Sequence, residues 1–192
     1  SDQSVAGGGV YLNSFLPQSV VDRTAAYAFG QGYKSFVALV QNTAAGTLAE
    51  RQLRETLQEL GGTLLQVERY EPNDASVQTA AAAIAAKANE AQAIFIPDGG
   101  NSPAAITSAL RSNGVDLSTK KLLGTALWNT AALGDPALAG AWFADLDQER
   151  ISAFKARYKE KFGAEPSTNA VLGYDSVALA IAIVRSHGPV GF

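Results

Sequence analysis

The chain lacks several residue types, and each absence narrows the chemistry open to it. Its 192 residues include no cysteine, no methionine and a single histidine. Without cysteine there is no disulfide, no thiolate nucleophile and no cysteine-bound metal. His187 stands beside Gly188-Pro189 after a predicted helix, which favours a solvated helix cap over a general base. No Ser-His-Asp or Cys-His set can be assembled, so we expect a non-enzymatic protein that needs no cofactor.

Long apolar runs and an excess of positive charge are also missing. The longest apolar runs fall far short of the roughly 20 residues that a transmembrane helix needs. A formal net charge of −3 provides no positive field to attract nucleic acid. Neither the Rossmann glycine spacing nor a P-loop occurs, and Gly7-Gly8-Gly9 precedes a strand instead of following one. Acidic residues stand at every second position in Asp145, Asp147 and Glu149. This pattern is more typical of the charges at the start of a helix than of a metal site, so we expect no bound metal.

The chain is instead rich in short apolar runs that alternate with helical patterns. The patterns predict strands at 10–13, 35–41, 63–70, 93–96, 121–126 and 140–144, and helices at 22–30, 47–60, 74–88, 102–110, 149–162 and 169–186. The run 63–70 alternates apolar and polar residues, which indicates a half-exposed strand nearer an edge. Asp74 or Ser76 can cap the helix at 74–88, and Ser102 is the predicted cap of the helix at 102–110. The helix at 149–162 carries an apolar stripe of Ile151, Phe154, Tyr158 and Phe162. This alternation predicts an α/β fold: a three-layer αβα, Rossmann-like lobe with a mostly parallel sheet.

The pattern changes near residue 146, where two helices follow each other without a strand between them. We therefore expect a flexible leader at 1–9, an α/β lobe at 10–145 and a helical segment at 146–192 that belongs to, or packs on, another lobe. The absence of methionine and the Gly-rich start favour a processed or excised piece of a longer protein.

Three loops each follow a buried strand: 42–47, 98–102 and 126–130. In a parallel sheet they open on the same edge, where ligands commonly bind. Each loop alone is more typical of an ordinary turn, and it is their shared edge that favours a binding site. The candidate ligand-binding side chains in these loops are Thr43, Asp98, Asn101, Ser102 and Trp128.

Several segments resemble the type I periplasmic binding proteins, the Leu/Ile/Val-binding or extracellular ligand-binding receptor family. They include AIFIPDGG, SALRSNGV and the helix-loop-helix segment that ends in Tyr174-Asp175-Ser176-Val177-Ala178. The resemblance implies a second lobe, with C-terminal helices that return to a first lobe, most of which is absent. It also implies a periplasmic solute receptor with two partners, a small-molecule ligand and the membrane permease of an ABC transporter, which closes about its ligand by a hinge.

The ligand-side positions depart from that family's pattern. Ala45-Gly46 stands where amino-acid-binding members carry Tyr-Gly, and Gly100-Asn101 occupies the usual aromatic positions, so the resemblance adds Ala45 and Gly100 to the candidates. The stretch 125–128 holds no carboxylate at the acidic anchoring position. LLGTALWNT and GDPALAGAWFADLD are similar to penicillin-binding protein activator lipoproteins. That similarity implies an alternative function: a regulator of cell-wall synthesis that binds a penicillin-binding protein, with a lipid anchor in the full-length protein.

Overall fold

The computed structural model describes residues 17–128, 134–145, 148–167 and 170–188. It divides into two compact units. One is Pro17–Asp145, and the other contains the helices α5 (Gln148–Phe162) and α6 (Ala170–His187). In the described part of the chain, no helix is long and apolar enough to cross a membrane.

The larger unit is built around a sheet of five parallel strands in the order β2-β1-β3-β4-β5. The strands are β1 (Ser35–Gln41), β2 (Thr63–Tyr70), β3 (Ala93–Phe95), β4 (Lys121–Gly124) and β5 (Trp142–Phe143). The helices are α1 (Pro17–Gly30), α2 (Ala44–Leu60), α3 (Asp74–Glu90) and α4 (Ser102–Ser112). The predicted α/β lobe with a parallel sheet is therefore confirmed, and β2 lies at the edge of the sheet, as its alternating pattern predicted.

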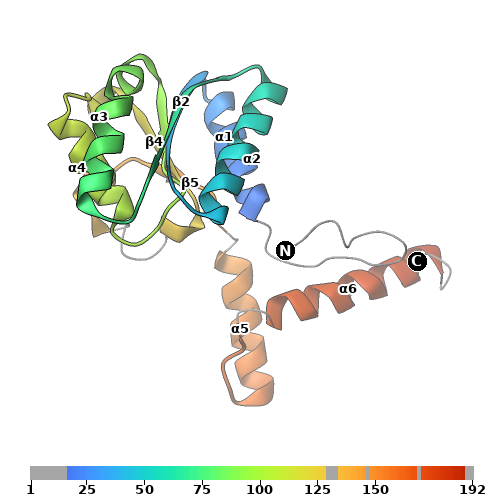
Figure 1. Cartoon of the computed structure of the whole chain (residues 1–192). Coiled ribbons are helices and arrows are strands. Elements are labelled where there is room, and N and C mark those ends of the chain that lie inside the picture. The colour runs from blue at the N-terminus through green and yellow to red at the C-terminus, as the bar shows by residue number, and fades with distance from the viewer. Residues whose placement is uncertain (1–16, 129–133, 146–147, 168–169, 189–192) are drawn as a thin grey trace. The chain divides into compact units, whose positions relative to one another are not determined.

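Helices α3 and α4 cover one face of this sheet, and α1 and α2 cover the other (Figure 1). Val37, Leu39 and Ile94 point toward α3 and α4, whereas Phe36, Ala38 and Phe95 point toward α1 and α2. Successive residues of one strand thus serve opposite cores, which explains why β1 reads as an uninterrupted apolar run.

Helix and strand ends differ from the predictions where a cap or a close contact decides them. Asn73 caps α3 by accepting a hydrogen bond from Ser76 N, where Asp74 or Ser76 was the predicted cap. The strand predicted to reach residue 126 ends at Gly124, because the Trp128 ring folds back over that glycine, and a Cβ there would overlap the indole. The predicted strand at 10–13 lies outside the described residues.

The smaller unit has an aromatic cluster of its own. Phe154 packs against Tyr158 and Tyr174, with ring centroids 5.9 and 5.3 Å apart. Tyr158 continues the stripe to Phe162 at 4.6 Å, so the apolar stripe predicted on α5 is present. The assignment of residues 1–9 to a leader and of 146–192 to another lobe remains a prediction.

Candidate functional site

The carboxyl ends of the central strands bring two of the predicted loops together. β1 lies between β2 and β3, and the loops that follow β1 and β3 lead into α2 and α4. The side chain of Asp98 reaches the end of β1, where Gln41 N donates to its Oδ2 at 3.1 Å. Gln41 Nε2 lies 3.5 Å from Ser102 Oγ. Residues 57 to 61 positions apart in the sequence therefore meet at one sheet edge.

Asp98 joins three strands at this edge. Besides the Gln41 amide, its Oδ2 accepts a hydrogen bond from the Tyr70 hydroxyl at 2.7 Å, and Tyr70 is only 1% exposed. Burial raises the pKa of Asp98, although the bonds from Tyr70 and Gln41 act in the opposite direction. Burial and the neighbouring Asp98 also raise the pKa of Tyr70. One oxygen of this predicted ligand residue thus holds the ends of β1, β2 and β3 together.

The start of α2 forms the first exposed part of the edge. Thr43 caps the helix by accepting a bond from Gly46 N at 3.1 Å. Ala44 and Ala45 are exposed, and their N–H groups have no acceptor among the described residues. Gly46 lies so close to β1 that a Cβ would overlap the carbonyl oxygen of Gln41. This close approach holds the helix terminus directly beside the end of the strand.

The start of α4 forms the second exposed part. Helix α4 begins at Ser102 with Pro103 in its first turn. The cap position is held by Asn101, where the sequence predicted Ser102, and the Asn101 side chain makes no capping bond. Gly100 takes a left-handed conformation with φ of 61°, and both Gly100 and Asn101 are exposed. The Asn101 amide is therefore open to a ligand at this edge.

The third loop does not contribute its tryptophan. Trp128 is 2% exposed, and its indole Nε1 donates to the Ile96 carbonyl at 3.0 Å. The expectation that Trp128 lines a cleft is thus corrected: it is a core residue because Gly124 leaves room for its ring. Among the described residues of this loop, Leu127 is the exposed one, at 60%. No periodic pattern in the sequence distinguishes Leu127 from Trp128, so the sequence could not assign the two roles.

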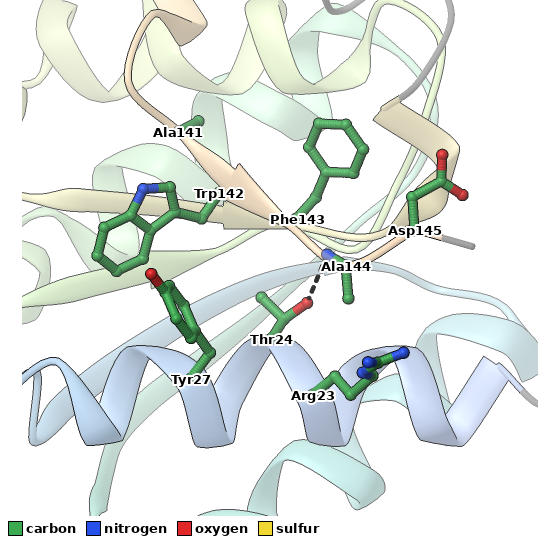
Figure 2. A pocket seen from close by; sticks show the side chains of 8 residues that line it. All are labelled: Arg23, Thr24, Tyr27, Ala141, Trp142, Phe143, Ala144 and Asp145. Atoms are coloured by element: carbon green, nitrogen blue, oxygen red, sulfur yellow. Dashed lines mark hydrogen bonds between the residues drawn. The ribbon is translucent and has the colours of Figure 1, made fainter. Parts of the chain in front are cut away.

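A hollow elsewhere in this unit was not predicted from the sequence. It encloses about 440 Å³ between α1 and the edge strand β5 (Figure 2). The Thr24 hydroxyl holds its floor together by accepting from Ala144 N at 3.0 Å and donating to Gly124 O at 3.3 Å. Among the described residues, no cluster of three His, Cys, Asp or Glu side chains could hold a metal ion.

In parallel α/β lobes of this kind, ligands commonly bind where the loops gather at the carboxyl edge of the sheet. The model of the periplasmic binding protein family matches residues 2–191. The chain belongs to this family. No curated protein matches the chain significantly.

Three solved structures show the same fold. A protein from Rhodospirillum rubrum described as a branched-chain amino acid ABC transporter is 23% identical, with a TM-score of 0.69 over 93% of this chain and 52% of its own. A solute-binding protein from R. palustris in complex with benzoate is 20% identical, with a TM-score of 0.59 over 93% and 50%. A substrate-binding protein from Desulfitobacterium hafniense in complex with Leu is 18% identical, with a TM-score of 0.52 over 85% and 48%. The chain spans about half the length of these proteins.

Proposed function

We propose that the chain forms one lobe of an extracytoplasmic solute-binding protein that serves an ABC transporter, and that the carboxyl edge of its sheet is one wall of the ligand cleft. The observation that carries this proposal is the pairing of two exposed helix starts, those of α2 and α4, beside the ends of β1 and β3. A small-molecule ligand and a membrane permease are then the partners, and the periplasm is the location. Regulation of a penicillin-binding protein stays a prediction from the sequence resemblance alone.

The proposed wall combines small side chains with polar groups. Ala45 and Gly100 leave the space above the edge open, while Thr43, Asn101 and Ser102 offer a hydroxyl, an amide and a second hydroxyl. The N–H groups of Ala44 and Ala45 lie at the N-terminus of α2, which is the positive end of the helix dipole. Such a wall accepts the oxygen atoms of a carboxylate, and the second lobe of the protein would complete the contacts to the rest of the ligand.

Residues beneath the wall hold it in place. The bonds from Gln41 and Tyr70 to Asp98 keep the ends of three strands in register. Thr125 Oγ1 donates to the Pro97 carbonyl at 2.9 Å, and Trp128 donates to Ile96 O, so the backbone ahead of Asp98 is also held by the segment that follows β4. A wall built this way is organised before any ligand arrives, which lowers the entropic cost of binding.

Amide NMR of the 192-residue chain tests the proposal. The two compounds named in the related complexes, leucine and benzoate, are titrated into labelled protein. We expect the amide signals of Ala44, Ala45, Gly100 and Asn101 to move with at least one of them. A single wall should give a dissociation constant on the order of 1 mM, equivalent to about 4 kcal/mol.

A matched pair of variants makes the test specific. Ala45→Trp places a large ring over the edge and should weaken binding at least about tenfold, or about 1.4 kcal/mol. Ala86→Trp puts the same ring on an exposed position of α3 and should leave binding unchanged. The proposal is wrong if neither compound moves the edge amides at about 20 mM, or if the two variants bind equally.

A further inference from the structure

The hollow between α1 and β5, which we name the α1–β5 groove, is separate from the sheet edge described above. Eight residues line it, and none of them belongs to the edge: Arg23, Thr24, Tyr27, Ala141, Trp142, Phe143, Ala144 and Asp145 (Figure 2). Its volume of about 440 Å³ falls in the range of small-molecule sites, roughly 300 to 1,000 Å³. The groove therefore has room for a ligand of its own.

One end of the groove is aromatic. The Trp142 ring meets Tyr27 edge-on, with centroids 5.1 Å apart and planes at 67°. Tyr33 supports the same indole from another side at 5.7 Å. Tyr27 is 57% exposed, so part of this aromatic surface is open to solvent. An aryl group can add to it by the edge-to-face contacts that aromatic rings favour.

The other end of the groove is charged. Figure 2 shows Arg23 and Asp145 at the end away from the two rings. Between the ends, the Thr24 hydroxyl already donates to Gly124 O and accepts from Ala144 N. The floor of the groove therefore needs no hydrogen bond from a ligand. Arg23 is exposed, and a guanidinium binds a carboxylate through paired N–H groups. Asp145 offers carboxylate oxygens, which accept from more than one donor.

These features select one class of ligand. The Asp145 carboxylate would repel a dianion, and an uncharged aromatic compound would make no ion pair with Arg23. We propose that the α1–β5 groove binds a small aryl hydroxy acid: its ring lies against Tyr27 and Trp142, its carboxylate on Arg23, and its neighbouring hydroxyl donates to Asp145.

The test uses 3-phenyllactate as the probe and amide NMR of the 192-residue chain as the readout. We expect the amides of residues 141–144 and the indole N–H of Trp142 to move. The indole N–H of Trp128 is an internal control that should stay in place, because it is buried and bonded to the Ile96 carbonyl. Two analogues should bind at least about fivefold more weakly: 3-phenylpropionate, which lacks the hydroxyl, and 3-phenylpropane-1,2-diol, which lacks the carboxylate.

Two arginine variants complete the test. Arg23→Gln should weaken 3-phenyllactate at least about fivefold. Arg51→Gln removes an arginine that is 65% exposed on α2 and outside the groove, and it should change nothing. The inference is overturned if the groove signals stay in place, if the analogues bind as well as the probe, or if the two variants bind alike. Movement at Ala44, Ala45, Gly100 and Asn101 alone would support the proposed cleft wall and overturn the groove site, so the two proposals fail separately.

Discussion

The hydrogen bond from Tyr70 to Asp98 should make a measurable contribution to stability. Tyr70 is 1% exposed, and its hydroxyl lies 2.7 Å from Asp98 Oδ2. A hydrogen bond to a charged group contributes about 1.5–3 kcal/mol. Tyr70→Phe leaves the Gln41 amide as the remaining donor to that oxygen, so we expect a loss of about 2 kcal/mol at neutral pH. For a chain of this length, the melting temperature should fall by about 4–8 °C.

The size of this loss should depend on pH. Burial raises the pKa of Asp98, so its protonated form is favoured in the folded state, and the stability this provides is lost as pH rises through the folded pKa. The Tyr70 bond lowers that pKa, and its removal raises the pKa further. Tyr70→Phe therefore loses the most stability when Asp98 is ionised. The penalty shrinks as pH falls through the raised pKa of Asp98 and the carboxyl group takes up its proton.

Urea unfolding followed by circular dichroism, at about pH 7 and about pH 3.5, measures both effects. Tyr27→Phe is the matched control, because Tyr27 is 57% exposed and the loss of its hydroxyl should cost less than about 0.5 kcal/mol. A Tyr70→Phe loss that is equal at the two pH values would refute the role assigned to Asp98. A loss below about 0.5 kcal/mol at neutral pH would refute the hydrogen bond itself.

Three further changes test the packing around the two candidate sites. Gly46→Ala forces a Cβ into the end of β1 and should lower the free energy of unfolding in urea by more than about 2 kcal/mol. Gly30→Ala, which has open space around it, should lower it by less than about 0.5 kcal/mol, and similar losses would contradict the close approach. Thr24→Val removes both bonds of the hydroxyl and should cost about 2 kcal/mol and speed hydrogen exchange at Ala144; unchanged exchange would argue against that bond. Trp128→Phe leaves a buried carbonyl without its donor and should cost about 1–3 kcal/mol, while a neutral result would show the indole bond to be dispensable.

Local patterns predicted most elements of the lobe. The bounds of β1 and β2 match the predicted runs 35–41 and 63–70 because each run is delimited by polar or turn residues. The helix predicted to start at residue 47 begins at Ala44, because Thr43 caps it one turn earlier. The sequence predicted Ser102 as the cap of α4, but Asn101 holds that position, because the backbone geometry at the two residues decides where the helix begins.

The candidate site was predicted less completely than the fold. The parallel topology correctly brought the loops after β1 and β3 to one edge, since that follows from the alternation of strands and helices. The contacts of each side chain could not be predicted from that alternation. Asp98 is engaged by Tyr70, 28 positions away, and Trp128 by Ile96, 32 positions away, and neither pairing leaves a local signal.

The sequence by itself determined the α/β class, the parallel sheet, the edge at which the loops meet and the resemblance to periplasmic binding proteins. All of these depend on periodicity, caps and motifs within short stretches of chain. Only the tertiary structure decided that Asp98 joins three strands, that Trp128 fills the space over Gly124, and that α1 meets β5 to form a groove. The Thr24–Ala144 bond that holds the groove spans 120 positions, and contacts at such separations are set by packing in three dimensions.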